Sequence, residues 1–595
     1  MRKTLLITVL LGMALLVNAI PAYNVWQVFQ QPDGSLIRLL LVGDEHLHYY
    51  MTDDHAVVIQ DKNAFYYAQC SGNHLRPSSL LAHEQELRTM AEWASLIMVD
   101  EAERLRPRLQ RKSPAGMARQ RKSPYVGERK GLVILVDFPD RKFFDAEEQG
   151  EEATLNRYGA MLNQSGYTND LGAIGSVHDY FLDQSGGAFS LSFDVVGPIT
   201  MPQPSYYYGQ DLGKNSFDLN VPEMLVEACT QIDNEVDFSK YDWDGDGMVE
   251  EVFLLYAGYG QATGGTRDTI WPHMWSLTEA KADEGVLNGP VAFDGVWVDV
   301  YACSNELYGK IGTSEMGIGT FCHEFSHCLG LPDLYDVDNQ SLFSLGSWDL
   351  MSNGNYNGPG GRGWVPAGYS ACERWLAGWL QPTELHNDTV VNDMPPLAEQ
   401  PTAYVIYNDA YRNEYYILEN RSKTVWDAYL PGQGLLISHV DYDEQAWMAN
   451  TVITLNGFDQ RHLTFFNASG MSSGWKNVYP YESNDSLTDH SSPAATLFHA
   501  NTDGSFLMHK PVSDITRDEA SSLISFRFAN LNNSTSSIAL VEREGKIITD
   551  VYSLDGRLLT DLLPHDSSID SLKILPPGFY IVRYSDDTTR KLLIR

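Results

Sequence analysis

The sequence predicts a multidomain α+β protein, on three observations. The chain has 595 residues, enough for about four domains of about 150 residues each. Hydrophobic residues make up 43% and charged residues 20%, which is the balance of globular domains with sizeable cores. Helix-like and strand-like segments are mixed up to about residue 385, and turn-separated strand-like segments dominate afterwards.

The first 22 residues have the pattern of a signal peptide. Met1–Thr4 is basic, Leu5–Val17 is apolar, and Ala19 and Ala22 both offer a small-residue cleavage site. The apolar stretch is too short for a comfortable membrane span. We therefore predict export, a signal peptide over residues 1–22 and no transmembrane segment in the mature protein.

The next region, up to about residue 105, is predicted to begin with strands and end with a helix. Ile37–Val42, His48–Met51 and Ala64–Ala68 have strand character and are separated by turn-type sequences. Leu81–Leu105 has helical character. These elements are expected to form an N-terminal domain.

A basic segment, Arg106–Lys130, follows in an otherwise acidic chain. It contains Arg-Lys-Ser-Pro twice and few apolar residues, which is typical of an exposed linker. Two interpretations remain open: a plain interdomain linker, or a processing site that separates residues 23–130 from the rest.

Strand and helix signals recur through the middle of the chain. Gly131–Asp137 is an apolar run of strand length, and Ser176–Asp183 is predicted as a helix within an α+β region over 131–385. Strand-like segments then dominate residues 386–530 and 531–595. They are Ala403–Tyr407, Glu414–Glu419, Gly434–Val440, Ile547–Leu554 and Phe579–Tyr584.

The formal net charge of −36 limits the possible partners. Nucleic acid is excluded, because phosphate binding needs positive charge. Solubility explains the acidity, and the carboxylates also suit calcium. Six cysteines in so long a chain do not form a disulfide scaffold, and their pairing, including that of Cys322 and Cys328, stays open.

The segment His323-Glu-Phe-Ser-His327 carries the strongest chemical signal. On a helix, residues four apart lie on one face, so both imidazoles can take two positions on a tetrahedral zinc ion. Glu324 lies beside the first ligand and can act as general base toward the attacking water. The segment therefore predicts a metal-dependent hydrolytic centre.

A third ligand is expected soon after this helix. Gly330 can adopt a left-handed conformation and turn the chain, and Pro332 stops the helix. Asp333 then lies six residues after His327, where metzincin-type sites place their third ligand. Asp336 is the alternative.

Three further residues are candidates around the metal. Met351, within Ser347–Ser352, can form a hydrophobic floor below the ion, a Met-turn, or simply fill the core. Tyr335 and Tyr356 can each polarise the oxyanion of the transition state.

An Asp-rich loop predicts a structural calcium site. Asp242, Asp244 and Asp246 take positions one, three and five of a calcium-binding loop, with Gly247 at position six. Position twelve, normally Glu, is Phe253. Glu250 and Glu251 can supply the missing carboxylate. The candidate calcium ligands are Asp242, Asp244, Asp246, Met248, Glu250 and Glu251.

Residues His323–Asp336, with Ser347–Met351 after them, resemble the immune inhibitor A-type metalloproteases of bacteria. Gly131–Asp140 and Ser176–Gly187 are similar to that family as well. The resemblance covers about residues 131–385 and implies a zincin/metzincin-like fold.

The resemblance implies secreted endopeptidases made as proenzymes, with catalytic zinc and stabilising calcium. It makes His323, His327 and Asp333 the metal ligands and Glu324 the catalytic residue. Residues 23–130 then become a propeptide, 131–385 a zinc metalloprotease catalytic domain and 386–530 a β-rich accessory domain.

The C-terminal tail resembles a second family. Val551–Arg557 and Leu575–Val582 are similar to the sorting domains of type IX secretion, which implies a C-terminal β-sandwich over 531–595. The type IX machinery would then be a partner. The protein would be secreted or attached to the cell surface after export through the periplasm of a Gram-negative bacterium. A generic β-sandwich module is the alternative.

Two function classes follow. The first is an endopeptidase acting on protein or peptide substrates. The second is a cell-surface binding or adhesive protein with a degenerate metalloprotease domain. Two smaller hypotheses concern other residues: His439 and Asp441 either bind a second ion or contain a hydrogen-bonded core histidine, and Cys70 or His46 can block the metal of the proenzyme.

Overall fold

The computed structural model consists of two compact units, Met1–Ala529 and Asn530–Arg595, which are described separately. It describes residues 18–44, 47–71, 74–105, 125–212, 217–284, 289–337, 344–455, 460–470, 477–532, 548–553, 559, 578–584 and 589–594.

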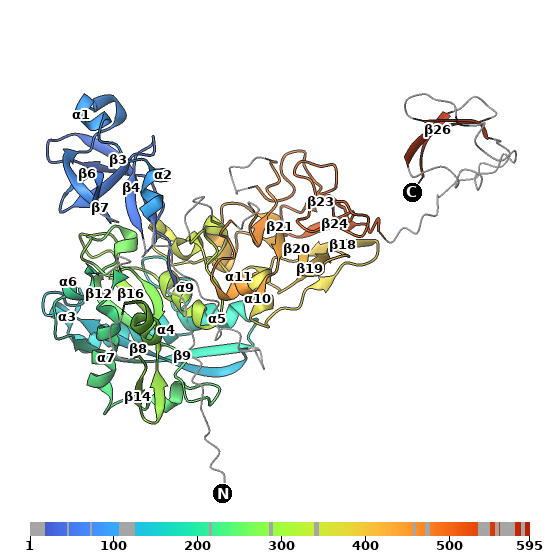
Figure 1. The fold of residues 1–595 in the computed structure, drawn as a ribbon. Coiled ribbons are helices and arrows are strands. Elements are labelled where there is room, and N and C mark those ends of the chain that lie inside the picture. The colour runs from blue at the N-terminus through green and yellow to red at the C-terminus, as the bar shows by residue number, and fades with distance from the viewer. Residues whose placement is uncertain are drawn as a thin grey trace, which may run out of the picture. The chain divides into compact units, whose positions relative to one another are not determined.

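The centre of the first unit is a six-stranded sheet in the order β1-β13-β16-β12-β8-β9 (Figure 1). Its strands are β1 (Asn18–Ala19), β8 (Gly127–Asp137), β9 (Phe189–Thr200), β12 (Val252–Tyr259), β13 (His273–Ser276) and β16 (Val300–Leu307). The four strands from β16 to β9 run parallel, whereas β13 is antiparallel to β16. β1 adds to β13 in an antiparallel sense.

Helices cover both faces of this sheet. In β8, Val133 and Leu135 pack into one core together with residues of α4 (Glu151–Asn163), α5 (Val177–Gln184) and α9 (Gly319–Cys328). Leu132, Ile134 and Val136 pack into a second core with α7 (Val221–Ile232). Because both faces are covered, the strand reads as a continuous apolar run, as the sequence predicted.

The predicted helix at 176–183 is confirmed as α5. Ser176 caps its N-terminus, and the Ser176 and Asp179 side chains and backbone amides form a reciprocal capping box.

The N-terminal domain is an antiparallel six-stranded sheet in the order β2-β3-β4-β5-β6-β7. Its strands are β2 (Gln27–Gln30), β3 (Leu36–Gly43), β4 (His48–Met51), β5 (Val57–Asp61), β6 (Ala64–Ser71) and β7 (His74–Leu81). The three strands predicted here are confirmed as β3, β4 and β6.

The continuous helical character predicted for 81–105 is wrong. The segment holds only single turns: η1 (Gln85–Leu87), α1 (Met90–Trp93), α2 (Val99–Ala102) and η2 (Glu103–Leu105). The backbone between them bonds elsewhere, since Ile97 O accepts from Val57 N and Val99 N donates to His55 O. Tertiary pairing with the start of β5 therefore replaces the helical bonds.

The basic linker lies mostly outside the described residues, which resume at Tyr125. Strand β8 begins at Gly127, so the last four residues of the predicted linker belong to the central sheet.

Residues 383–528 form two β-sheets. The larger has the order β17-β19-β20-β21-β22, and the smaller the order β18-β24-β23. The strands are β17 (Thr383–Glu384), β18 (Thr389–Met394), β19 (Ala403–Tyr407), β20 (Glu414–Arg421), β21 (Gly434–Asp441), β22 (Leu463–Phe465), β23 (Val512–Arg517) and β24 (Ile524–Phe528). The β-rich character predicted for this region is confirmed.

This β-rich region shares its core with the central domain. Tyr415 and Ile417 on β20 belong to the same apolar cluster as α5 and α9, whereas the alternate residues Tyr416 and Leu418 face a core of their own. The buried Arg421 adds an ionic connection: it pairs with Asp427 and Glu419 and donates to the carbonyl of Gly368. The two regions thus fold as one unit.

The shorter elements complete the first unit. They are α3 (Ala146–Gln149), α6 (Ser205–Tyr208), α8 (Leu277–Glu284), α10 (Ala371–Leu376), α11 (Glu444–Met448), β10 (Asp211–Leu212), β11 (Phe217–Asp218), β14 (Val291–Phe293) and β15 (Val296–Val298), with 3-10 turns η3 (Phe238–Tyr241), η4 (Gln261–Thr263), η5 (Gly346–Trp348), η6 (Asn353–Tyr356), η7 (Pro359–Gly361) and η8 (Val425–Tyr429).

The second unit contains a three-stranded antiparallel sheet, β25 (Ile548–Ser553), β26 (Gly578–Tyr584) and β27 (Thr589–Ile594). Two predicted strands are confirmed as β25 and β26. The described strands of this unit form this one sheet, so the predicted β-sandwich stays a prediction.

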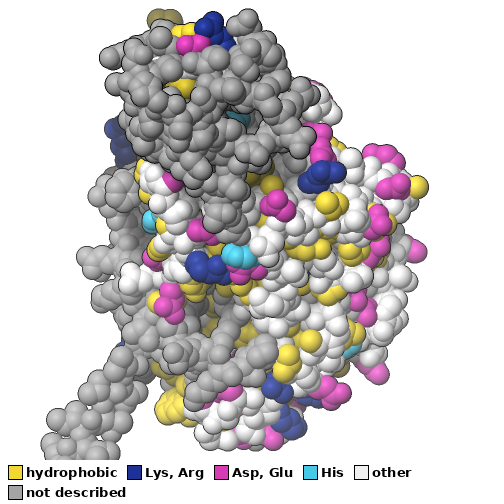
Figure 2. All heavy atoms as spheres, turned by 90° about the vertical axis from the view of Figure 1, so that its right-hand side faces the viewer, with side chains coloured by type: hydrophobic (Ala, Val, Ile, Leu, Met, Phe, Trp, Pro, Cys, Tyr) yellow, Lys and Arg dark blue, Asp and Glu magenta, His cyan; other side chains and the backbone are white. Residues whose placement is uncertain are grey.

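Acidic side chains outnumber basic ones on the molecular face in Figure 2, in line with 78 Asp and Glu against 42 Lys and Arg. Of the helices in the described part of the chain, none combines the length and apolar character that crossing a membrane requires.

Candidate active site

Helix α9 carries His323, Glu324 and His327, and all three side chains are buried. The helix can lie this deep because it begins at Gly319. A Cβ atom there would lie 1.7 Å from the carbonyl oxygen of Asn355. The backbone of the 353–356 turn therefore packs directly against the start of the helix.

Hydrogen bonds fix the direction of both imidazoles. Nδ1 of His323 donates to the carbonyl of Leu350 at 2.9 Å, and Nδ1 of His327 donates to that of Leu331 at 2.8 Å. A carbonyl only accepts, so each Nδ1 carries the proton and each Nε2 presents a lone pair. Burial lowers the pKa of His323, which favours the neutral form that binds metals.

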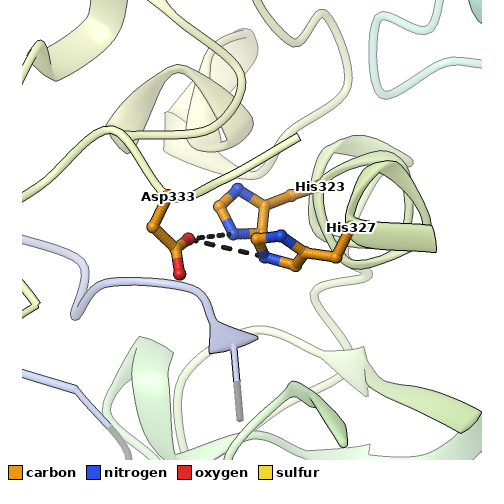
Figure 3. Close-up of side chains that lie close together, drawn as sticks. All are labelled: His323, His327 and Asp333. Carbon is orange, nitrogen blue, oxygen red and sulfur yellow. Dashed lines mark ion pairs between the residues drawn. The ribbon is translucent and has the colours of Figure 1, made fainter. Parts of the chain in front are cut away.

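Asp333 completes a group of three side chains that could hold a metal ion, as Figure 3 shows. Gly330 adopts the predicted left-handed conformation, with φ of 76°, and turns the chain back toward the helix. One carboxylate oxygen of Asp333, Oδ1, lies 3.1 Å from Nε2 of His323 and 3.5 Å from Nε2 of His327. Ligand atoms on a tetrahedral zinc ion lie about 3.3 Å apart. Asp336, the alternative ligand, is buried but is not in this group.

The three ligand atoms fit a divalent ion. Nε2 of His323, Nε2 of His327 and Oδ1 of Asp333 are buried, and none of them forms a hydrogen bond to another described group. Burying polar atoms without partners is costly, and two imidazole nitrogens with one carboxylate oxygen are a typical zinc donor set.

Asn450 orients the third ligand from the β-rich region. Its Nδ2 donates to Oδ2 of Asp333 at 2.6 Å, and its Oδ1 accepts from the Asp333 backbone amide at 2.7 Å. Oδ2 is thereby held away, and Oδ1 faces the imidazoles. Sequence reasoning missed Asn450, because it lies 117 residues further along the chain.

The predicted Met-turn residue, Met351, is joined by a backbone hydrogen bond to the residue that follows Asp333. Met351 is fully buried, and its carbonyl accepts from Leu334 N at 2.6 Å, next to Asp333. Its own amide donates to Asp349. Since Leu350 O holds His323, this turn supports two of the three ligands.

The N-terminal segment lies against the candidate site at Glu324. Asn18 and Ala19 pair with Met274 and His273 of the edge strand β13, and the Ile20 amide donates to Oε1 of Glu324 at 3.1 Å. The blue N-terminal ribbon runs past the three ligands in Figure 3. No local signal in the sequence predicted this contact.

Two side chains hold the carbonyls that follow. Nε1 of Trp271 donates to Ile20 O at 3.0 Å, and the Tyr356 hydroxyl donates to Pro21 O at 2.8 Å. Tyr356, a candidate for oxyanion binding, thus donates to the carbonyl of Pro21, one residue after Ile20, whose amide donates to Glu324. Tyr335, which lies between Asp333 and Asp336 in the sequence, is buried. Its role in binding the oxyanion stays a prediction.

The Asp-rich loop brings Asp242, Asp244 and Asp246 within reach of one ion. Glu250 approaches them, since its carboxylate accepts from Trp243 N at 2.7 Å. Burial, with the charges of Asp244 and Asp242, raises the pKa of Glu250 to about 7. A cation would relieve this repulsion.

Glu251 differs from Glu250. Burial alone raises its pKa, and neither carboxylate oxygen has a hydrogen-bond partner among the described residues. Of the two glutamates, only Glu250 is hydrogen-bonded to the Asp-rich loop, and the part of either in binding calcium stays a prediction. Met248 N donates to Asp246 Oδ1, which places Met248 in the loop.

The other candidate groups have ordinary structural roles. His439 is buried, and its Nε2 pairs with Oε1 of Glu414 at 2.8 Å, which fits a hydrogen-bonded core histidine. Asp441 pairs with His499 and His462 instead. Cys70, Cys229, Cys303, Cys322 and Cys372 are free thiols, and Cys70 is exposed on β6. His46 lies outside the described residues.

This fold and site define a metallopeptidase-type catalytic domain, which is a hydrolase, and sequence comparison supports the same class. Residues 120–381 match the family described as Immune inhibitor A peptidase M6, catalytic domain. The match agrees with the resemblance found in the sequence.

Three curated relatives each match part of the chain. The chain is 27% identical over 281 residues to the pre-pro-metalloprotease PrtV of Vibrio cholerae, covering 42% of this chain and 29% of PrtV. It is 26% identical over 264 residues to immune inhibitor A of Bacillus thuringiensis, covering 39% and 37% of the two chains. It is 24% identical over 271 residues to a putative secreted metallopeptidase of Arthroderma benhamiae, covering 38% of each. The chain thus spans well under half the length of these relatives.

Proposed function

We propose that the chain is a secreted zinc-dependent endopeptidase in which water attacks the peptide bond and Glu324 is the general base. One observation carries the proposal: three buried side-chain atoms without a hydrogen-bond partner among the described residues converge one residue away from a buried glutamate. A zinc ion held by His323, His327 and Asp333 supplies the Lewis acidity that polarises a carbonyl and activates water at neutral pH.

The chain's own residues perform the remaining tasks. Glu324 takes a proton from water and delivers it to the leaving nitrogen, which is the kind of atom that Ile20 N presents to Oε1. Hydrogen bonds to Asn450, Leu350 and Leu331 orient the three metal ligands. An extended peptide can pair with the edge strand β13, as β1 does.

A casein digest with and without a zinc chelator tests this function. The proposal predicts cleavage that the chelator stops and added zinc restores. A protein with a degenerate domain, serving adhesion, would bind cell surfaces and cleave nothing under either condition.

The contact of the N-terminal segment with Glu324 supports a proenzyme form. With Ile20 N on Glu324 and Ala22 fully buried, cleavage after Ala19 retains Ile20–Ala22 as the start of the propeptide, whereas cleavage after Ala22 removes them. We expect secreted precursor to begin at Ile20 or Tyr23, after one of the two predicted cleavage sites, and mature enzyme to begin within or after Arg106–Lys130.

N-terminal sequencing of both species tests this prediction. The precursor should also cleave casein more slowly than the mature form, because the propeptide lies against Glu324. Active protein that still begins near residue 20 would contradict the propeptide assignment.

Calcium is proposed as a structural ion bound by Asp242, Asp244, Asp246 and Glu250, with the Met248 carbonyl. Saturating calcium should raise the unfolding temperature by on the order of 5 °C, because binding to the folded state alone stabilises it. The Asp244→Asn variant should lose most of this shift, and the exposed control Glu235→Gln should keep it. An equal shift in both variants would place calcium elsewhere.

Export is proposed from the resemblances in the sequence. The tail resembles a type IX sorting domain, and β25–β27 support a β-structured C-terminal unit. A Gram-negative bacterium would then release the protein or attach it to its surface. Deleting residues 531–595 should leave the protein in the periplasm, which cell fractionation would measure.

A further inference from the structure

The N-terminal segment provides a template for how a substrate lies at Glu324. Asn18 and Ala19 pair with the edge strand, and the next amide, that of Ile20, contacts Glu324. If Glu324 protonates the leaving nitrogen, as proposed above, the Ala19–Ile20 bond occupies the position of the bond to be cut. Ile20 then stands for the first substrate residue on the leaving-group side.

The backbone after this bond is held by two donors of the catalytic domain. Trp271 Nε1 binds the carbonyl of Ile20, and the Tyr356 hydroxyl binds that of Pro21. Trp271 is itself fixed, because its amide donates to Asp218 Oδ2 at 2.6 Å and its carbonyl accepts from His273 Nδ1 at 2.7 Å. These supports belong to the catalytic domain and remain when the segment leaves.

The Ile20 side chain is completely buried. The apolar cluster around it contains Ala262, Trp271, Met316 and Tyr356 of the catalytic domain, together with residues of the N-terminal domain such as Ile37, Leu39 and Tyr50. A branched aliphatic side chain gains about 0.8 kcal/mol for each buried CH₂ in such surroundings, whereas a charge buried without a partner costs far more.

We infer that the site selects substrates with a bulky aliphatic residue directly after the cleaved bond, and that Trp271 and Tyr356 bind the next two carbonyls. The inference rests on the proposed peptidase function and assigns the substrate class of that site. Trp271 is a specificity-determining residue here, since it both lines the pocket and holds the carbonyl of the residue inside it.

Cleavage of matched peptides is the first test. Peptides based on residues 16–25, with Ile, Ala or Asp at the position of Ile20, are given to the zinc-loaded mature protein. We expect kcat/KM to fall about 10- to 100-fold from Ile to Ala and at least about 100-fold from Ile to Asp. Equal rates for the three peptides would overturn the inference while leaving the peptidase function intact.

A second test needs no activity. In the full chain, Ile20→Asp should release the segment and speed hydrogen exchange of residues 18–23, whereas Ile20→Val should leave their protection in place. If no peptide is cut but these two variants differ as expected, the proposed function fails and the pocket assignment stands. If Ile20→Asp keeps full protection, the pocket is not selective and the inference fails.

A variant of Trp271 tests its hydrogen bond to the carbonyl of Ile20. Trp271→Phe keeps a large ring but loses the Nε1 donor, so kcat/KM for the Ile peptide should fall about 2- to 10-fold, the range of one hydrogen bond. Trp297→Phe, at an exposed position on β15, should leave it unchanged. An equal effect of both changes would remove Trp271 from the site.

Discussion

Replacing Glu324 with glutamine is expected to reduce peptide cleavage by about 10²- to 10⁴-fold while zinc content and fold stay unchanged. Glutamine has the same shape as glutamate. It keeps an oxygen at the position where Oε1 accepts a hydrogen bond from the Ile20 amide at 3.1 Å. It cannot take a proton from water at neutral pH. The loss should therefore appear in kcat, with little change in KM.

The control for this experiment is Glu152→Gln, an exposed glutamate on α4 of the same domain. Peptide cleavage by the Glu152→Gln variant should be unaffected. Metal analysis and circular dichroism of both variants complete the comparison. Near-normal proteolysis by Glu324→Gln would rule out the general-base mechanism, and loss of zinc along with activity would assign Glu324 a structural role instead.

Replacing Asn450 with glycine is expected to weaken zinc binding about 10- to 100-fold, the usual effect of losing a group that orients a metal ligand. Asn450 forms two hydrogen bonds to Asp333, one to its carboxylate and one to its amide. Its φ is 52°, a left-handed conformation that glycine adopts without strain. The variant therefore removes the side chain and leaves the backbone conformation allowed.

Chelator competition measures this effect directly. Asn501→Gly is the matched control, because Asn501 is a buried asparagine in the same β-rich region and bonds to Leu507 O and Met508 O. It should lower stability without changing the zinc affinity. If both variants bind zinc as tightly as the unchanged chain, the β-rich region has no part in the metal centre.

Local sequence patterns predicted the parts of the site that lie close together in the chain. The spacing of His323 and His327 places both on one face of α9, and Gly330 at positive φ brings Asp333 back to them. The apolar run 131–137 became the central strand β8. Each of these depends on interactions within a few residues, which a sequence displays directly.

The remainder depends on contacts between distant segments. Asn450 meets Asp333 across 117 residues, and Ile20 meets Glu324 across 304. Neither partner stands out by type or spacing in its own surroundings. The helical prediction for 81–105 is wrong for the same reason, because His55 and Val57, at the start of β5, take its backbone hydrogen bonds.

The most direct test of the account is the zinc content of the purified chain and of its His323→Ala variant, measured by elemental analysis after dialysis. His439→Ala is the control, because His439 is a buried histidine that pairs with Glu414 away from the site. The account predicts about one zinc per chain in the unchanged protein and in the control, and almost none in His323→Ala. Equal zinc in all three proteins, or zinc in none of them, would contradict it.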